Sequence, residues 1–488
     1  MKRLTIVTLV VLFSMVLAAC GGAATPAPVP TAAPKAAAPT AAPAPTMAPE
    51  PTKAAAAAPA SASVGASAEG AASKGLTCLA DAYNGKLKGT KVSMTGPFVD
   101  ADAVKFETSK KAFEQATGIT IEYAGTKEFE ANIGTQMAAG TAPDVIDWPQ
   151  PGLASTYFKQ GKVLPVTKLV PESWLKENYK QSWLDMSTMT GADANPAMSG
   201  LWWRFNGKSL VWYPKKAFDA AGYTVPTTWD ELLKLQDQIV ADGDTPWCIG
   251  IGSGAATGWP ATVWAEDMML RTTSPENYDK WVKGELKFSS PEVKKAIETF
   301  APIWNNDKMV YGGKAAIVTT QFSDAPTPMF QNPPKCWLHR QGNFITSFFP
   351  KEAVAGVDYD VFYLPGVDAQ YGKPFLIAGD LVSATQDRPE VCAVMQYLST
   401  AAGVEAWLAA GGALGPQNDV TPEMYGVPLE RTIAGLAAAA TTVRFDASDL
   451  MPGAVGAGSE WKGFTDYFSG AADLDTVLKN IDASWPKQ

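Results

Sequence analysis

Three short segments decide the fold: TKVSMT (90–95), ITIEY (119–123) and DVIDW (144–148). Each segment is rich in β-branched, apolar or aromatic residues and predicts a strand. Two stretches with helical spacing of apolar residues, 101–117 and 129–139, lie between them, and a glycine follows each stretch as a helix stop. The order strand, helix, strand, helix, strand predicts a parallel sheet in an α/β layer.

Ligands of open parallel sheets bind beyond the carboxyl ends of the strands. In this chain the rule selects Pro97-Phe98 after the first strand and Trp148-Pro149-Gln150 after the third. We therefore expect the ligand site to include these two turns.

Further elements follow along the chain. Thr228 and Glu231 form the pattern of a capping box and predict a helix that begins there. Strands are predicted at 209–213 and 247–251, and helices at 291–304 and 389–409. The segments 360–364 and 375–383 are predicted to be strands that return to the first sheet.

The N-terminal segment predicts export. Lys2 and Arg3 precede an apolar stretch at 4–17, which is too short for a stable membrane span and is typical of a secretory signal peptide at 1–19. The run LAAC (17–20) resembles a bacterial lipobox, which implies that Cys20 carries a lipid and anchors the protein to the membrane. The alternative is an ordinary signal peptide with an incidental cysteine.

Residues 20–75 are rich in Ala, Pro, Thr and Ser and contain no aromatic residue. Such a segment buries too little apolar area to offset its ordering entropy, so we expect a disordered tether. The remaining chain, about 410 residues, is longer than one core usually organises, and two lobes are expected. The net charge of −9 argues against nucleic acid or an anionic membrane as the main partner.

Four cysteines besides Cys20 allow three disulfide connectivities outside the cytoplasm. We favour Cys248–Cys336, with Cys78–Cys392 as the second pair. A metal site is not expected, because there is no Cys-x-x-Cys motif and His339 is the lone histidine. No cofactor is expected either.

Aromatic residues and amide or acid residues gather near the predicted strand ends, as in Phe98 with Asp102 and Trp148 with Gln150. A pyranose offers a C–H face that packs on a flat ring and a rim of hydroxyls that pair with carboxylates and amides. This mixture favours a sugar site. A lone histidine and the lack of a Gly-x-Ser-x-Gly motif argue against most hydrolases, although paired carboxylates leave a glycosidase open.

Several long runs resemble the α-glucoside-binding proteins of ABC importers, and the similarity spans 79–487. The runs are 243–250, 253–262, 322–326, 336–341, 378–380 and 444–456. More distantly, 116–119, 142–146 and 228–231 are similar to maltose-binding protein. The resemblance implies an α/β, two-lobed type II periplasmic-binding-protein fold with three crossovers and no catalytic activity. It places lobe 1 at 79–207 plus 365–412, and lobe 2 at 208–364 plus 413–488.

The resemblance also implies the site and the partners. Trp148 and Trp461 correspond to stacking tryptophans, and Asn206 takes a polar place near the hinge. The full set of expected binding residues is Phe98, Asp102, Trp148, Gln150, Asn206, Ser253, Thr257, Asp324, Arg340, Gln341, Asp380 and Trp461. The expected protein is a monomer that closes on an oligosaccharide and delivers it to two permease subunits with an ATPase behind them. The alternatives are another sugar, a compatible solute such as a glucosylated osmolyte, an α-glucoside hydrolase, or a surface adhesin.

Overall fold

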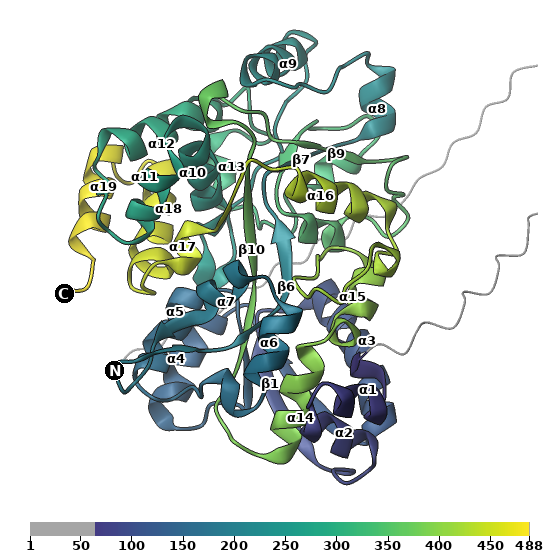
Figure 1. Ribbon diagram of the computed structural model, residues 1–488. Coiled ribbons are helices and arrows are strands. Elements are labelled where there is room, and N and C mark those ends of the chain that lie inside the picture. The colour runs from purple at the N-terminus through teal and green to yellow at the C-terminus, as the bar shows by residue number, and fades with distance from the viewer. Residues whose placement is uncertain (1–63, 488) are drawn as a thin grey trace, which may run out of the picture. The chain divides into compact units, whose positions relative to one another are not determined.

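The structure, a computed structural model, describes residues 64–487 (Figure 1). The expected signal peptide at 1–19, Cys20 and the first part of the expected tether lie outside the described residues. The expectation that the tether extends to residue 75 is wrong for its last part. Val64–Ala66 and α1 (Ala68–Ser73) are helical, Ala71 is fully buried, and the Tyr83 hydroxyl donates to the Gly65 carbonyl.

The described chain has three sheets, and the two with the most strands organise the lobes. The strands of the larger sheet are β1 (Lys91–Gly96), β2 (Thr120–Gly125), β3 (Val145–Trp148), β6 (Leu201–Gly207), β10 (Pro374–Ala384) and β11 (Thr442–Phe445). The smaller sheet consists of β7 (Leu210–Tyr213), β8 (His339–Arg340) and β9 (Asp360–Tyr363), and β4 (Thr188–Thr190) pairs with β5 (Pro196–Met198). Lobe 1 is built on β1, β2 and β3, and lobe 2 on the smaller sheet.

The helices of lobe 1 and its flanks are α2 (Thr77–Tyr83), α3 (Asp100–Thr117), α4 (Phe129–Ala139), α5 (Pro151–Lys159), α6 (Glu172–Asn178), α7 (Gln181–Ser187), α14 (Pro389–Leu398), α15 (Glu405–Ala410) and α16 (Pro428–Ala438). Those of lobe 2 are α8 (Lys215–Ala220), α9 (Trp229–Ala241), α10 (Trp259–Thr272), α11 (Pro275–Val282), α12 (Pro291–Trp304), α13 (Lys314–Ile317), α17 (Ala447–Leu450), α18 (Trp461–Ser469) and α19 (Leu474–Ala483).

The first predicted unit is confirmed. β1 pairs in parallel with β2 on one side and with β3 on the other, and α3 and α4 connect them. Gly118 and Gly140 follow these helices with φ angles of 71° and 69°, in the left-handed region where glycine has no steric penalty. The carboxyl ends of the three strands therefore meet at one edge of the sheet.

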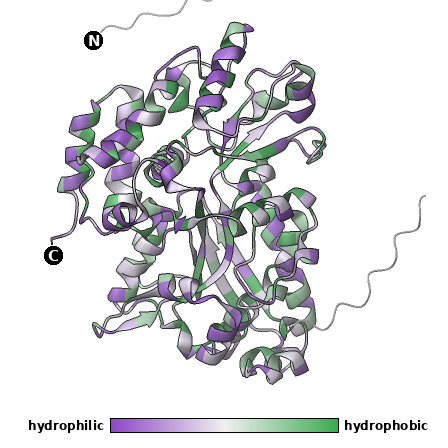
Figure 2. Ribbon diagram, turned by 45° about the horizontal axis from the view of Figure 1, so that its top comes forward, coloured by the Kyte–Doolittle hydropathy of each residue, from purple (hydrophilic) through white to green (hydrophobic). Residues whose placement is uncertain are grey.

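Two long strands join the lobes. β10 pairs antiparallel with β3 and with β6, and its first residues pair in parallel with β11. β6 ends at Gly207, and β7 of lobe 2 begins three residues later. One cluster of buried apolar residues fills lobe 1 and extends past the hinge into lobe 2, where it includes Trp212, Phe349 and Tyr359. A second cluster fills the rest of lobe 2. Figure 2 shows hydrophobic residues along the central strands and hydrophilic ones on the outer helices.

Three predicted elements differ in the structure. The strand predicted at 360–364 is β9, but it pairs with β7 in lobe 2, because a strand pattern does not specify its partner. The segment 247–251 makes only isolated bridges, as at Trp247. The helix predicted at 389–409 is interrupted between α14 and α15, where a single 3-10 turn, Ala401–Gly403, intervenes.

The chain also remains packed on lobe 1 after residue 412, where the sequence analysis placed the boundary between lobe 1 and lobe 2. Leu414 and Phe205 of β6 exchange two backbone hydrogen bonds of 2.8 Å. The Gln417 side chain donates to the Trp203 carbonyl at 2.7 Å. Residues 413–417 thus pack on lobe 1, whereas the sequence placed them in lobe 2.

Two disulfides join distant parts of the chain. Cys78 of α2 is bonded to Cys392 of α14, and Cys248 is bonded to Cys336 in lobe 2. This is the connectivity that the sequence analysis favoured. The first bond ties the start of lobe 1 to a helix 314 residues later.

Candidate functional site

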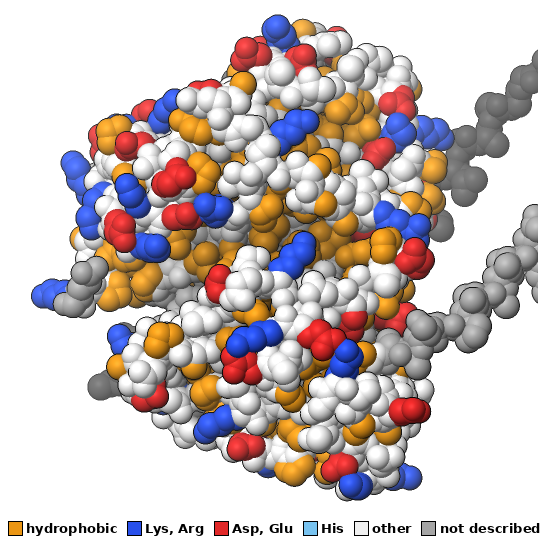
Figure 3. Space-filling model, viewed as in Figure 1, with side chains coloured by type: hydrophobic (Ala, Val, Ile, Leu, Met, Phe, Trp, Pro, Cys, Tyr) orange, Lys and Arg blue, Asp and Glu red, His pale blue; other side chains and the backbone are white. Residues whose placement is uncertain are grey.

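A cavity of about 200 Å³, open to solvent, lies between the lobes. Figure 3 shows one face of the molecule, which is hollowed between the two halves.

Lobe 1 contributes the turns at the carboxyl ends of its three parallel strands. Phe98 lies in the turn after β1, and Asp102 in the first turn of the helix α3 that follows. Lys127 lies in the turn after β2, Glu130 at the start of α4, and Gln150 in the turn after β3. This placement agrees with the strand-end rule. Lobe 1 therefore presents mainly acids and an amide to the cavity.

The hinge strands form the floor. Arg204 of β6 pairs with Asp380 of β10 at 3.1 Å, and both side chains are buried. The guanidinium carbon of Arg204 lies 4.4 Å from the ring centre of Phe98 and 4.2 Å from that of Trp407. Burial raises the pKa of Asp380 to about 6, although Arg204 opposes the shift. The arginine thus holds an acid and an aromatic ring of the cavity in fixed positions.

Lobe 2 contributes an aromatic wall, made of Trp259, Phe322, Phe344 and Phe348. The ring centre of Trp259 lies 5.3 Å from that of Phe322 and 5.9 Å from that of Phe344. All four residues are partly exposed. Flat, partly exposed rings of this kind offer packing surface to the apolar face of a ligand.

A buried ion pair closes the site behind this wall. The Lys208 ammonium donates to the Asp446 carboxylate at 2.8 Å and lies 4.9 Å from the Trp259 ring centre. Burial opposes charge on both groups, but their mutual attraction outweighs it, so the pKa of Lys208 is raised and that of Asp446 is lowered. Both groups therefore stay charged at neutral pH.

Asn206 is held by a chain of hydrogen bonds at the hinge. Its amide donates to the Gly412 carbonyl at 2.9 Å and to the Asn343 side chain at 3.2 Å. Asn343 in turn donates to Glu430 at 2.7 Å. Burial raises the pKa of Glu430 to about 7. The network fixes the Asn206 side chain between residues of both lobes.

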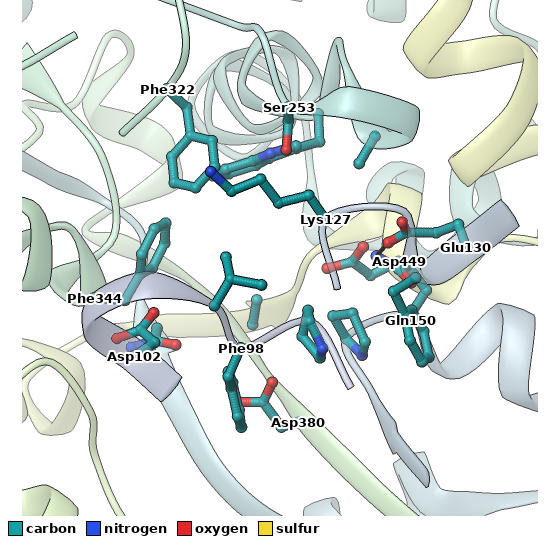
Figure 4. A pocket seen from close by; sticks show the side chains of 18 of the residues that line it. Phe98, Asp102, Lys127, Glu130, Gln150, Ser253, Phe322, Phe344, Asp380 and Asp449 are labelled. Carbon is teal, nitrogen blue, oxygen red and sulfur yellow. Dashed lines mark hydrogen bonds between the residues drawn. The ribbon is translucent and has the colours of Figure 1, made fainter. Parts of the chain in front are cut away.

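Seven of the twelve expected binding residues line the cavity: Phe98, Asp102, Gln150, Asn206, Ser253, Asp380 and Trp461. They come from lobe 1, the hinge and lobe 2. Figure 4 shows Phe98 and Asp380 close together, with Asp102 and Gln150 on opposite sides of them.

Trp148 does not line the cavity. Its side chain is fully buried, and its ring centre lies 5.7 Å from those of Phe129 and Tyr157. The chain turns directly after β3, so Gln150 faces the cavity while the indole stays in the core of lobe 1. The stacking role expected for Trp148 is therefore not part of the site.

Four other expected residues also lie outside the cavity lining. Arg340 is buried in an ion pair with Asp267. The Gln341 side chain accepts from the Gly342 amide, and the Thr257 hydroxyl shapes its own loop by donating to the Gly254 carbonyl. Asp324 is exposed outside the lining.

Other lining residues were absent from the expected set: Arg204, Lys208, Trp259, Glu130, Phe344, Phe348, Asp446 and Asp449. The sequence contained a signal for some of these residues. Trp259 lies in the run 253–262, and Asp446 and Asp449 lie in the run 444–456, both of which carried the family resemblance.

The part of the chain that the structure describes has no group of three or more His, Cys, Asp or Glu side chains arranged to hold a metal ion. None of the described helices is long and apolar enough to cross a membrane.

Comparison with known sequences identifies close relatives. The model of a family described as bacterial extracellular solute-binding protein matches residues 96–405. The chain is 42% identical over 403 residues to the alpha-glucosides-binding periplasmic protein AglE of Rhizobium meliloti, which covers 82% of this chain and 88% of that protein. It is 39% identical over 411 residues to the osmoprotective compounds-binding protein GgtB of Synechocystis sp., with 84% and 96% covered.

Solved structures share the fold. The solute receptor AcbH, described as preferring β-D-galactopyranose, matches with a TM-score of 0.70 at 18% identity and covers 81% of this chain and 98% of its own. Maltose-bound MalE3 of T. maritima matches with a TM-score of 0.63 at 15% identity, with 81% and 98% covered. The expected α/β periplasmic-binding-protein fold is thereby confirmed.

Proposed function

The chain belongs to the family of bacterial extracellular solute-binding proteins, and from this premise we propose that it captures an α-glucoside or a glucosylated osmoprotectant between its lobes. It is the extracellular or periplasmic solute-binding component of an ABC importer for sugars or osmolytes. It is a binding protein and not an enzyme, so the hydrolase alternative is set aside.

One observation carries the choice of ligand: the cavity combines an aromatic wall on lobe 2 with acids and an amide on lobe 1. Packing one sugar face on a ring covers about 60–80 Å² and contributes ~1.5–2 kcal/mol. Hydrogen bonds to the acids supply the rest of the ~8 kcal/mol that a micromolar site needs. The names of the two relatives refer to α-glucosides and to osmoprotective compounds, and they support the same class of ligand.

The contacts between the lobes support a mechanism of closure. Ser347 of lobe 2 donates to Asp102 of lobe 1 at 2.7 Å and accepts from Lys105 at 2.8 Å. At the rim, Gly254 of lobe 2 lies against Glu128, the residue that precedes α4. A ligand that touches both lobes favours this closed form by its extra affinity for it. The closed protein then presents its surface to the permease.

We also propose that lipidated Cys20 ties the protein to the outer face of the cell membrane. The lipobox-like run and the Ala/Pro-rich segment support this anchor. The substitution Cys20→Ala should move the protein from the membrane fraction to the soluble fraction. Retention of the variant in the membrane fraction would exclude the anchor.

A thermal-shift screen of the full chain tests the proposed function. The compounds are maltose, trehalose, sucrose, trehalulose, palatinose and α-glucosylglycerol, with lactose as a β-linked control. We expect at least one of the six α-glucosides to raise the melting temperature by several degrees, because binding to the folded state alone stabilises it. No shift with any of the six would reject this ligand class.

A further inference from the structure

A second cavity, of about 490 Å³, adjoins the ligand cavity. It lies between the same two lobes, and its lining includes residues of α3 in lobe 1 and of the segment 346–353 in lobe 2. Asp100 lines both cavities. The second cavity is larger than the ligand cavity, so it has room for further groups of a ligand. The proposed function does not use this space.

Two short elements separate the cavities, and each of them has residues on both sides. On α3, Asp102 lines the ligand cavity, whereas Lys105 lines the second cavity. Lobe 2 contributes the 3-10 helix Asn343–Phe348. On this helix Phe348 lines the ligand cavity, whereas Ser347 lines the second cavity. The first turns of α3 and this 3-10 helix therefore form a wall between the two cavities.

Three side chains close the gap in this wall, and we call Asp102, Lys105 and Ser347 the interlobe bridge. The Ser347 hydroxyl donates to the Asp102 carboxylate at 2.7 Å and accepts from Lys105 Nζ at 2.8 Å. Lys105 Nζ also donates to the Gly411 carbonyl at 2.7 Å. The bridge packs against the backbone at Gly412, where a Cβ would lie 2.9 Å from Lys105 Nζ and 3.3 Å from Ser347 Oγ. The bridge therefore fills the space between the lobes at this point.

The opposite end of the ligand cavity is closed as well. Gln150 and Asp449 line that end and are 5% and 7% exposed. Figure 4 shows both residues on the side opposite Asp102 and Phe344. A ligand that fills the cavity between these two ends has space beyond it only behind the bridge, where the second cavity begins.

We propose that Lys105 and Ser347 determine the length of the ligand: with Asp102 they form an end wall that accepts a short α-glucoside and excludes one that is longer by a glucose unit. The inference rests on the proposed function and specifies the size class of its ligand. Neither Lys105 nor Ser347 lines the ligand cavity, so both act on the ligand through the wall that they form. A further sugar ring would break the bridge and leave its buried polar groups without partners, which costs binding free energy.

Titration calorimetry on the full chain tests the wall. The ligands are the α-glucoside with the largest thermal shift and two homologues that carry one more α-linked glucose unit, at the glucosyl end or at the opposite end. The variants are Lys105→Ala, Ser347→Ala and the double variant. Ser289→Ala with Lys294→Ala is the matched control, because it removes a serine–aspartate hydrogen bond and a lysine–aspartate ion pair within lobe 2. Melting temperatures without ligand verify that each variant folds.

Each homologue should bind the wild type and the control variant at least ~10-fold more weakly than the short glucoside, because the wall leaves no room for it. In the double variant, the ratio of the two affinities should shift by at least ~10-fold in favour of one homologue. Loss of the contact between the lobes weakens all ligands equally, so this ratio does not respond to it. Adding Ala353→Phe to the double variant refills the second cavity, which Ala353 lines, and should cancel the gain.

Three outcomes would overturn the inference. They are a homologue that binds the wild type as tightly as the short glucoside, a ratio that is the same in the double variant and the wild type, and a gain that persists with Ala353→Phe. The proposed function would stand in each case, since the wild type still binds the short glucoside. If the wild type binds none of the three compounds, the proposed function fails, and this inference fails with it.

Discussion

The substitution Trp259→Ala is expected to weaken binding of the preferred α-glucoside by about 10- to 30-fold. Trp259 is the largest ring of the aromatic wall, and it lines the cavity while partly exposed. Removing it uncovers about 60–80 Å² of sugar face, which is worth ~1.5–2 kcal/mol. Titration calorimetry of the folded variant measures the change directly.

Trp259→Phe is the matched control, because a phenyl ring retains much of the flat surface. We expect this variant to bind within about 3-fold of the wild type. Trp148→Ala provides a second comparison, since Trp148 is fully buried away from the cavity. It should lower the melting temperature far more than the affinity. Unchanged binding by folded Trp259→Ala would remove the aromatic wall from the site.

The second large effect concerns stability. Asp267→Asn is expected to lower the free energy of unfolding by about 3–5 kcal/mol at pH 7. Asp267 is fully buried and pairs with Arg271 at 2.6 Å and with Arg340, and it also accepts the Ser209 hydroxyl at 2.6 Å. The variant leaves two buried guanidinium groups without a counter-charge. Urea-induced unfolding measures the loss.

The pH dependence of this effect has a definite sign. Burial raises the pKa of Asp267, but Arg340 and Arg271 outweigh it, so the pKa lies below its usual value. An acid with a depressed pKa stabilises the fold at pH values above its unfolded pKa, and this stability is lost as the pH falls through the folded pKa. The difference in the free energy of unfolding between wild type and Asp267→Asn should thus be largest near pH 7 and should decrease in strong acid.

Asp279→Asn is the control for Asp267→Asn, because Asp279 forms a bidentate pair with Arg444 that is partly exposed to solvent. An exposed pair contributes roughly 0–1 kcal/mol. A loss at Asp267 no larger than the loss at Asp279 would contradict the view that the buried ion pairs of Asp267 stabilise the fold more than a partly exposed pair does.

The sequence predicted best what local patterns encode. The apolar spacing between 90 and 148 yielded β1, α3, β2, α4 and β3, and Thr228 with Glu231 yielded the capping box of α9. The pairing of strands that are distant in the sequence was harder to predict. The strand predicted at 360–364 pairs with β7 in the sheet of lobe 2. The alternation of apolar and polar residues predicts a strand but does not specify which strand it pairs with.

The binding residues were predicted only in part, because the sequence does not show how distant side chains pack. Strand ends identified Phe98 and Gln150, but a tryptophan beside a turn is equally suited to a core and to a binding surface. Trp148 belongs to the core and Trp259 to the cavity, and only the packing of the chain separates them. Arg340 is likewise taken up by Asp267, a partner 73 residues away in sequence.

The central claim is that the ligand binds between the lobes and holds them together. Spin labels at Thr135→Cys on α4 and Lys314→Cys on α13, both exposed, report the distance between the lobes by pulsed electron resonance. With the best glucoside of the thermal screen at saturation, the account predicts a shift of the distance distribution to shorter values. An identical distribution with and without the bound glucoside would contradict it.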